Sequence, residues 1–329
     1  MVVLEESRFE NVRTVSSAAS KVASGEAPEQ VFFDARLRDT KHRVVEAPVF
    51  SAGVQMADTH AHLDMLHYPA LALARAAAHQ VSFVVSVVDP TEDPSFTLDN
   101  LDAWQQEAGE LLKRWSDEED SEEREPDAPP EVSVIMGCHP HNASAYTEAV
   151  EAQLVHALTT DPRVVGIGEI GLDYHYDNSP REVQQRVFRR QIHLAHEHES
   201  TIALHLREAH ADGLRILKEE GLPAQGVLLH CFNLDYATLE PFLELGALVA
   251  FGGPLTFKKS DEVRAAAART PLDRLVTETD SPFMAPVPVR GSVCEPASVV
   301  FTAEVLAGLR TEPAALKQIY TNARRFFIP

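Results

Sequence analysis

From Met56 onward, short apolar runs alternate with amphipathic stretches along the chain. This alternation is typical of repeated strand–helix units, in which the strands are buried and each helix covers the sheet with one apolar face. Eight strand candidates occur, the number that a closed parallel barrel requires. We therefore predict a (β/α)₈ TIM barrel over residues 56–329. The predicted strands are 56–62, 81–88, 131–138, 164–169, 201–206, 226–231, 247–251 and 274–279.

The amphipathic stretches predict the helices that connect these strands. About 274 residues are left for the barrel, which is close to the usual size of about 250 residues for this fold. The predicted helices include 69–79, 181–199, 208–220, 261–269, 296–309 and 313–326.

Two segments lie outside this pattern. Residues 1–55 have no strong period, and we interpret them as an N-terminal extension that forms either a short helix on the outside of the barrel or a partly disordered arm. The stretch at about 116–131 is rich in acids and ends in prolines, so it cannot bury a core face, and we predict a solvated acidic loop insertion.

Composition limits the classes of function. The formal net charge of −21 argues against a broad phosphate-binding surface, so any contact with nucleic acid must be local. No stretch is apolar enough to span a membrane, and the N-terminus has acids where a signal peptide would be basic, so we expect a cytoplasmic protein. The three cysteines fit reduced thiols, and we expect Cys138 and Cys231 to be small apolar fillers.

In the first predicted strand, Asp58, His60 and His62 occupy alternate positions, so their side chains leave the same face. On a barrel strand that face is the interior, and the active sites of this fold lie at the carboxyl-terminal mouth. Two histidines two residues apart are weak evidence for a metal site when taken alone.

Four further polar residues end later strands in the same way, each directly after an apolar run: Glu169, His205, His230 and Asp280. Together with the first pair they place four imidazoles and two carboxylates at one rim. This mixed set of nitrogen and oxygen donors suits one or two divalent metal ions such as Zn²⁺, Mn²⁺ or Mg²⁺.

A competing motif overlaps this site, because Gly166, Gly168 and Gly171 match the G-x-G-x-x-G pattern of dinucleotide-binding proteins. That pattern requires a helix to begin at the glycines, whereas we expect residues 172–180 to form a polar loop. A carboxylate at Glu169 would also repel phosphates. We therefore predict no dinucleotide cofactor.

The motifs taken together resemble those of the TatD-type deoxyribonucleases, a metal-dependent family within the amidohydrolase-like superfamily. The resemblance covers about 56–329. Two departures concern the residues around substrate, since Asn233 and its neighbours replace a glycine-containing turn and Cys294 stands where asparagine is usual. The matching strings are ADTHAHLD, GCHPHNA, VGIGEIGLDYHYD, ALHLREA, LLHCF, FGGPLTFKKS, ETDSP, a following RG..CEP, and TNARRFF.

The resemblance implies a phosphodiesterase that cuts DNA at strand ends with the help of divalent metal ions. Carried over position by position, it implies that one metal is held by His60, His62 and Asp280, that Glu169 bridges, and that His205 and His230 complete a second site. A water activated by such ions would attack the phosphodiester, and Asp280 would act as general base.

Four other residues are predicted to contact substrate near this mouth: His139, His141, Arg207 and Arg290. Each has an alternative structural role; for Arg207 this is an ion pair with Glu169 or Asp173. We expect Asn322 and Phe326 to be structural, closing the barrel. We expect the histidines of the predicted helix 181–199 to lie on the surface.

Two other functions remain open at this point. The same metal site could serve an amidohydrolase or a deacylase of aminoacyl or other esters, because the ligands do not define the bond that is cut. A non-catalytic binding barrel is disfavoured, since no ligand position is replaced. The expected substrate is DNA or another phosphodiester, the expected assembly is a monomer or a small homo-oligomer, and no membrane partner is expected.

Overall fold

A computed structural model describes residues 31–92, 95–118, 128–312 and 314–328. Residues 34–329 form one compact unit. The segment predicted as an N-terminal extension thus lies partly outside the described residues, and its remainder, from Asp34, belongs to the unit that contains the barrel. Most of the acidic insertion, at 119–127, also lies outside the described part of the chain.

In residues 34–55 the structure describes no helix. Instead β1 (Leu37–Arg38) pairs antiparallel with β2 (Val44–Val45). Side chains from the barrel's first helix and from the turn after it donate hydrogen bonds to backbone carbonyls of this segment. Arg75 Nε donates to the carbonyl of Asp34 at 2.8 Å, and Gln80 Nε2 donates to that of Val54 at 3.1 Å. Each strand is only two residues long, which is too short to produce a periodic pattern in the sequence.

Eight parallel strands form the central sheet, in sequence order around the barrel, and each neighbouring pair is in parallel register. A parallel bridge from Ala61 to Ser281 joins the first strand to the segment after the last and brings the two edges together. The predicted TIM barrel is thus confirmed. The strands are β3 (Met56–Ala61), β4 (Val81–Val88), β5 (Glu131–Met136), β6 (Val164–Asp173), β7 (Thr201–Arg207), β8 (Val227–Leu229), β9 (Leu248–Phe251) and β10 (Leu275–Thr277).

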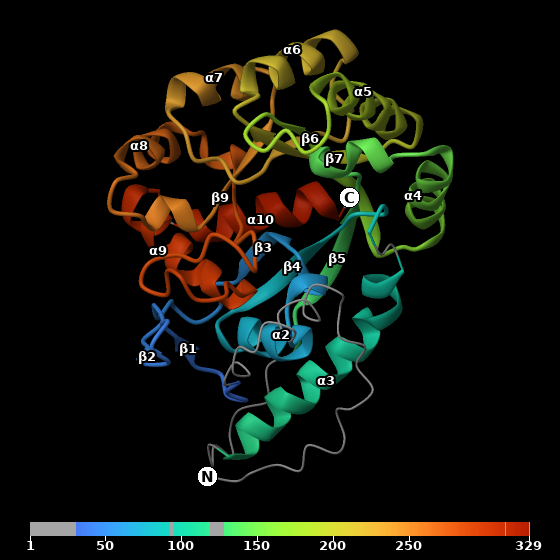
Figure 1. Ribbon diagram of the computed structural model, residues 1–329. Coiled ribbons are helices and arrows are strands. Elements are labelled where there is room, and N and C mark those ends of the chain that lie inside the picture. Colours follow the sequence, from blue (N-terminus) through green and yellow to red (C-terminus); the bar gives the residue numbers. More distant parts are fainter. Residues whose placement is uncertain (1–30, 93–94, 119–127, 313, 329) are drawn as a thin grey trace. The chain divides into compact units, whose positions relative to one another are not determined.

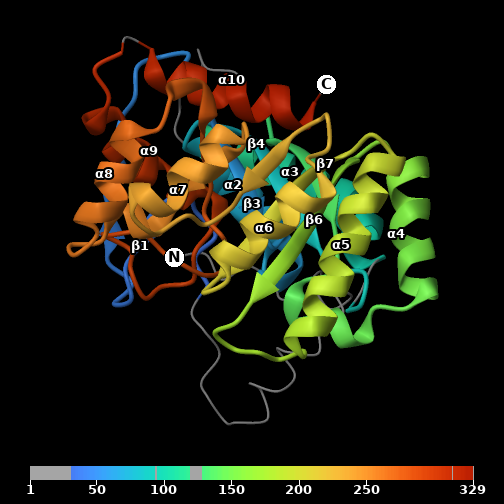
Figure 2. The same cartoon turned by 90° about the horizontal axis from the view of Figure 1, so that it is seen from above.

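Helices surround the strands, as Figures 1 and 2 show from two directions. Short 3₁₀ helices open several of the loops: η2 (Leu63–Met65), η3 (Pro140–Ala145), η4 (Gly253–Thr256), η5 (Leu272–Arg274) and η6 (Pro296–Ser298). The α-helices are α2 (Pro69–Ala78), α3 (Phe96–Glu118), α4 (Glu148–Thr160), α5 (Arg181–Glu197), α6 (His210–Glu220), α7 (Tyr236–Glu244), α8 (Asp261–Arg269), α9 (Val299–Leu309) and α10 (Ala315–Phe327).

The last helix, α10, packs against the starts of the strands and fills the amino-terminal end of the barrel. Phe326 and Phe327 lie in one buried cluster with interior residues of the strands, among them Phe83 and Ile135. Asn322 Nδ2 donates to the carbonyls of Leu272 and Leu275, at 2.7 and 2.8 Å. The structural roles predicted for Asn322 and Phe326 are confirmed.

The strand β6 is four residues longer than predicted. β6 runs through Leu172 to Asp173, so the predicted polar loop starts two residues later than expected. Glycines 166, 168 and 171 lie inside this strand, and the next α-helix begins only at Arg181. The helix that a dinucleotide fingerprint requires at its glycines is therefore replaced by a continuing strand.

Among the described residues, no helix combines the length and the apolar character needed to cross a bilayer.

Candidate metal centre

Four histidines and two carboxylates converge at the carboxyl ends of the barrel strands. They come from five different strands, and the closure of the barrel brings them to one mouth. They are the six residues that the sequence placed there: His60 and His62 at the end of β3, Glu169 in β6, His205 in β7, His230 directly after β8, and Asp280 after β10.

The Glu169 carboxylate lies between the histidines. Its Oε2 atom is 3.3 Å from Nε2 of His60 and 3.7 Å from Nε2 of His62. Its Oε1 atom is 2.5 Å from Nδ1 of His205 and 2.9 Å from Nε2 of His230. The two oxygens of one side chain thus face two separate pairs of imidazoles.

His60 shows most clearly that this cluster suits a cation. The side chain is fully buried, and neither of its ring nitrogens has a hydrogen-bond partner. Its ring stacks on that of His230, with centroids 3.8 Å apart and planes 17° from parallel. Buried polar atoms without partners are costly, so an unpartnered imidazole beside a carboxylate calls for a ligand that the protein itself does not supply.

Three groups of side chains could each hold a metal ion, because their donor atoms lie within 4.8 Å of one another. Each combines imidazole nitrogens with one carboxylate oxygen, the donor set that borderline divalent ions accept. The groups are His60 with His62 and Glu169, His60 with His230 and Asp280, and His139 with Glu169 and His205.

The electrostatics keep both carboxylates ionised. Burial by itself would raise the pKa of Glu169, but the charges of His230, His139 and other neighbouring histidines outweigh it and hold the pKa well below the usual range. For Asp280, burial likewise opposes ionisation, but the nearby rings of His62, His230 and His60 outweigh it and lower the pKa. Anionic carboxylates at this mouth are what a cation requires.

The histidines divide into two kinds. For His230 and His205, burial works against the protonated ring, but the Glu169 charge overcomes it, and both pKa values are raised. The pKa of His60 is lowered, first by burial and then by the charge of His230. A neutral His60 has a free lone pair, which is the form of the ring that binds a metal.

Backbone geometry fixes these positions. Gly171 has φ +145°, and a Cβ atom at this site would lie 2.0 Å from the carbonyl oxygen of His205, so only glycine lets β6 and β7 approach here. Across the closure, Asp280 N donates to the carbonyl of His60 at 2.9 Å, and His62 N donates to that of Ser281 at 2.8 Å. The barrel seam thus holds the first histidine pair against Asp280.

A family model described as "TatD related DNase" matches residues 57–328 of this chain. The chain belongs to the TatD family. Among curated relatives, the "Uncharacterized metal-dependent hydrolase YabD" of Bacillus subtilis is 34% identical over 275 residues, which are 82% of this chain and 98% of that protein. The "3'-5' RNA nuclease TATDN2" of Homo sapiens is 36% identical over 187 residues, 55% of this chain and 24% of that protein.

The crystal structure of the TatD homologue YJJV from Escherichia coli superposes with a TM-score of 0.70 at 27% identity, covering 84% of this chain and 99% of that one. The resemblance on which the sequence analysis rested is therefore confirmed. The chain belongs to a family of metal-dependent hydrolases and carries histidine and carboxylate groups able to hold divalent ions.

Two histidines predicted to contact substrate lie beside the cluster of this TatD protein. Nε2 of His139 is 3.6 Å from Oε1 of Glu169, and Nε2 of His141 is 2.8 Å from Oδ2 of Asp173. Burial lowers the pKa of His139. His139 is thus close enough to join a metal-holding group, a role that the sequence analysis did not consider.

The two arginines predicted to contact substrate lie farther from the cluster. Arg207 is exposed, and its guanidinium lies over the ring of Tyr176, 4.7 Å from the centroid. No ion pair of Arg207 with Glu169 or Asp173 is formed. Arg290 is also exposed and lies over the ring of Phe257, 4.1 Å from the centroid. Both positive charges lie over aromatic rings, without a carboxylate partner among the described residues.

Sequence reasoning missed two buried carboxylates that lie behind the histidines, beside the ring nitrogens turned away from Glu169. Oδ2 of Asp173 is 3.2 Å from Nε2 of His205, the ring nitrogen turned away from Glu169. Oε2 of Glu278 is 3.6 Å from Nδ1 of His230, again the nitrogen turned away from Glu169. A signal was present, because Asp173 lies four residues after Glu169 and Glu278 two before Asp280, positions that strand alternation places on the same face.

The cysteines next to motif histidines differ from each other. Cys138 is buried against Ala143 and Val187, as expected of a small apolar filler. Cys231 is half-buried, and its backbone N–H donates to Oε1 of Glu278 at 2.6 Å. Asp58 also has a structural partner, since it accepts hydrogen bonds from the backbone and hydroxyl of Thr279, at 2.8 and 2.5 Å.

Proposed function

We propose that this TatD protein is a divalent-metal-dependent phosphodiesterase that hydrolyses DNA strands from a free 3′ end. The observation that carries the proposal is the buried His60 ring, which has no hydrogen-bond partner and lies against a central carboxylate at the barrel mouth. The name of the matching family model and the nuclease activity named for the human relative support a nucleic-acid substrate. A cytoplasmic location and a monomeric or small homo-oligomeric state form part of the same proposal.

The proposal assigns His60, His62 and Asp280 to one metal ion and His205 and His230 to a second, with Glu169 shared. This division follows the two faces of the Glu169 carboxylate, since Oε2 points to the first pair of histidines and Oε1 to the second. A divalent ion would supply Lewis acidity and positive charge beside a phosphoryl oxygen.

Asp280 is the residue best placed to accept a proton from the attacking water. Its pKa is lowered, so Oδ1 is ionised at neutral pH, and its side chain is 16% exposed, which leaves it open to the mouth. Oδ1 is 3.7 Å from Nε2 of His62, which orients the carboxylate. His139 and His141 lie at the same mouth, on the side that Oε1 of Glu169 faces, and we assign them to contacts with the substrate.

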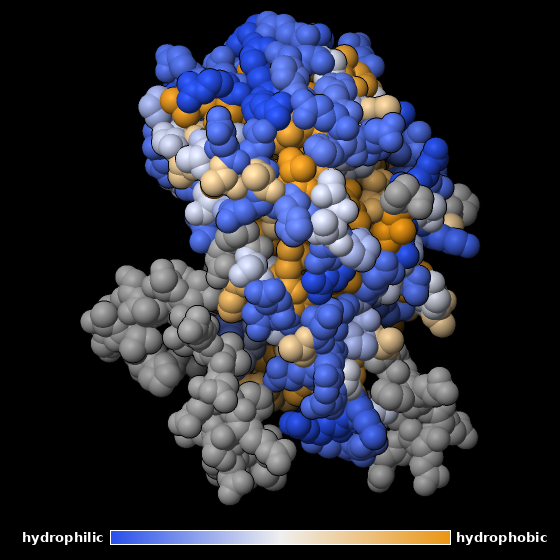
Figure 3. Space-filling model, turned by 90° about the vertical axis from the view of Figure 1, so that its right-hand side faces the viewer, coloured by the Kyte–Doolittle hydropathy of each residue, from blue (hydrophilic) through white to orange (hydrophobic). Residues whose placement is uncertain are grey.

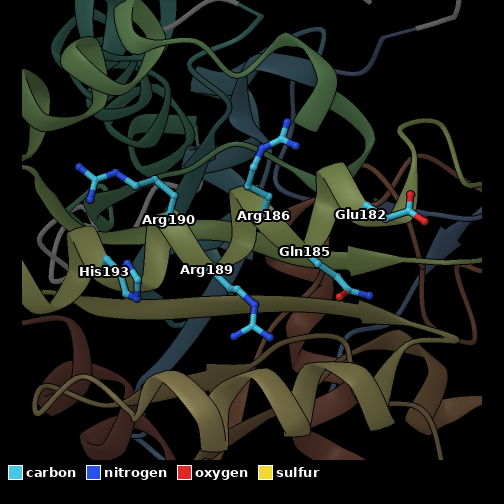
Figure 4. Close-up of a pocket in the computed structure, with 6 residues that line it drawn as sticks. All are labelled: Glu182, Gln185, Arg186, Arg189, Arg190 and His193. Atoms are coloured by element: carbon cyan, nitrogen blue, oxygen red, sulfur yellow. The ribbon is translucent and has the colours of Figure 1, made fainter.

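An acidic protein can bind a phosphodiester if the positive charge that it needs is confined to one site, so we compared the outer surface with the mouth of the barrel. The outer face that carries α4 and α5 is largely hydrophilic (Figure 3). A pocket of about 400 Å³ on α5 is lined by several basic side chains (Figure 4). These are largely neutralised, because Arg189 pairs with Glu219 and Glu220, and Nη2 of Arg190 lies 2.6 Å from Oε1 of Glu151. We therefore assign phosphate binding to the mouth.

The test is turnover by metal-depleted protein that is reloaded with Mg²⁺, Mn²⁺ or Zn²⁺ in turn. The substrates are single-stranded DNA with a free 3′ end, the same strand with a blocked 3′ end, the same strand with a blocked 5′ end, and the matching RNA. We expect hydrolysis that depends on added metal and falls at least tenfold when the 3′ end is blocked.

A panel of carboxylic esters, aminoacyl esters and amides is run beside the strands. Clear hydrolysis of an ester or amide without any phosphodiester hydrolysis would overturn the proposal in favour of a deacylase or amidohydrolase. Loss of activity only when the 5′ end is blocked would show that hydrolysis starts at the 5′ end and would overturn the proposed direction. Faster cleavage of RNA than of DNA would reassign the substrate.

A further inference from the structure

Exposed apolar side chains gather at the mouth of the barrel. Large hydrophobic side chains are normally covered in a folded protein, and a cluster of uncovered ones marks a binding surface. In the part of the chain that the structure describes, most of those that are exposed lie in loops that follow the carboxyl ends of barrel strands. They are Met65, Tyr176, Leu234, Phe283, Val287 and Val293.

The two aromatic members of this group lie on opposite sides of the metal cluster. Tyr176 follows β6 and Phe283 follows β10. In the closed ring of eight strands these two are four strands apart in either direction, which places them across the mouth from each other. Tyr176 is 55% exposed and Phe283 is 51% exposed, so each leaves about half of its surface free for a ligand.

Each aromatic ring also lies against a histidine of the mouth, His62 in the cluster or His141 beside it. The Tyr176 ring is 5.4 Å from the ring of His141. On the other side, the Phe283 ring is 6.1 Å from the ring of His62, whose Nε2 is 3.7 Å from both Glu169 and Asp280. A strand that crosses the metal cluster would therefore pass an exposed aromatic ring on either side of the phosphate that is cut.

A positive charge accompanies the first ring. The guanidinium of Arg207 lies over Tyr176, 4.7 Å from the centroid, and forms no ion pair with a described carboxylate. An arginine beside an aromatic ring offers a phosphate contact and a stacking surface together, the combination used by proteins that bind single strands.

We propose that Tyr176 and Phe283 are stacking platforms for unpaired bases on the two sides of the scissile phosphate, with Arg207 contacting the backbone. The proposal rests on the phosphodiesterase function proposed above and adds that the enzyme recognises bases as well as the phosphate. Bases inside a duplex are covered by their neighbours, whereas the unpaired bases of a strand end have free faces. The platforms therefore select single-stranded ends, with little preference for base identity.

A protein partner fits this surface less well. A docking surface for a protein has a continuous apolar centre. Here the polar cluster around Glu169 separates the two aromatic rings. Phe283 contacts His62 of that cluster, and Tyr176 contacts His141 beside it. Two separated rings beside a charged centre match the repeat of base and phosphate along a strand.

The test compares ordinary single strands with strands that carry abasic sugars at the last three 3′ positions. The abasic strands keep every phosphate and lose only the stacking bases. For the metal-loaded wild-type enzyme we expect KM to be about 5- to 100-fold higher for the abasic strand, the range that stacking of one base provides. This ratio of KM values should fall at least threefold in Tyr176→Ala and in Phe283→Ala, and should be retained in Tyr176→Trp and Phe283→Trp.

Val49→Ala is the matched control, because Val49 is a 97% exposed apolar residue that does not follow a barrel strand. It should keep the wild-type ratio. If the wild-type enzyme cleaves both strands with equal KM, or if the alanine variants keep the wild-type ratio, the platforms are refuted while the phosphodiesterase function stands. If the wild-type enzyme cleaves neither strand, the proposed function falls and this inference falls with it.

Discussion

The two ends of this barrel are built from the same strands and treat polar groups in opposite ways. At the amino-terminal end, Asn322 hydrogen-bonds two backbone carbonyls and α10 covers the interior with Phe326 and Phe327. At the carboxyl-terminal end, the ring of His60 is buried and neither of its nitrogens has a hydrogen-bond partner. The polar groups of the first end are hydrogen-bonded within the protein and stabilise the fold, whereas the second end leaves imidazole nitrogens free to bind a ligand.

Substitutions at the mouth are the most direct test of this difference between the two ends. We expect His60→Ala and Asp280→Asn each to lower kcat/KM on single-stranded DNA by about 10³-fold or more, because one removes a proposed metal ligand and the other the proposed proton acceptor. Far-UV circular dichroism and the urea-unfolding midpoint should stay close to those of the wild type. Wild-type turnover in both variants would show that these residues at the mouth take no part in the reaction.

The carboxylates behind the histidines provide a finer test of the same end. Asp173→Asn and Glu278→Gln should weaken metal binding by about 10- to 100-fold, since each withdraws the partner that orients one histidine ring. Metal titration of the depleted protein by calorimetry measures this, and activity should recover at saturating metal. Asp212→Asn is the control, because Asp212 bonds Tyr174 and Arg215 away from the cluster. An equal loss of affinity in the control would show that the orientation of the rings is unimportant.

The opposite result is expected at the amino-terminal end. Asn322→Ala leaves the carbonyls of Leu272 and Leu275 without their donor, which should cost about 1–3 kcal/mol of unfolding free energy. Chemical denaturation measures this loss, while kcat/KM should change less than twofold. A large loss of activity at unchanged stability would contradict the division of labour between the two ends.

The smallest expected effect concerns a histidine outside the cluster. Burial, followed by the charge of His205, lowers the pKa of His210 to about 4. Between pH 6.5 and 4 the unfolded chain therefore binds a proton at His210 more readily than the folded chain does. The contribution of neutral His210 to the free energy of unfolding is thus fully present above pH 6.5 and is lost as the pH falls. We expect the free energy of unfolding to fall by about 1 kcal/mol between pH 7 and 5 from this source, after allowance for the partial exposure of the ring. Urea unfolding of His210→Gln should show a correspondingly smaller fall over that interval; an identical fall in both proteins would contradict it.

Much of the barrel could be predicted from sequence because its strands are buried on both faces. A run such as Val81–Val88 is apolar almost throughout and stands out against the amphipathic helices around it. Four of the six residues at the mouth were predictable for the same reason, since Glu169, His205, His230 and Asp280 each come just after an apolar run. Residues two apart in a strand have side chains on the same face, so His60 and His62 could be placed together without knowledge of the fold.

The remainder depended on contacts that are distant in sequence or on very short elements. Asp173 was assigned to a loop because polar residues follow it, and only its pairing with Arg207 across to β7 shows that the strand continues. The stacking of His60 on His230 joins two residues that are far apart in the sequence. Whether a charged residue such as Arg207 meets a carboxylate or an aromatic ring is likewise decided by three-dimensional packing.

The Glu169 carboxylate, with its two oxygens turned toward different histidines, has a thermodynamic consequence. A ligand that fixes the torsion of this side chain through one oxygen also fixes the other oxygen. The occupancies of the two halves of the centre are then linked, and the linkage must be reciprocal: filling either half changes the affinity of the other by the same factor. One short side chain would thereby make the loading of the site cooperative.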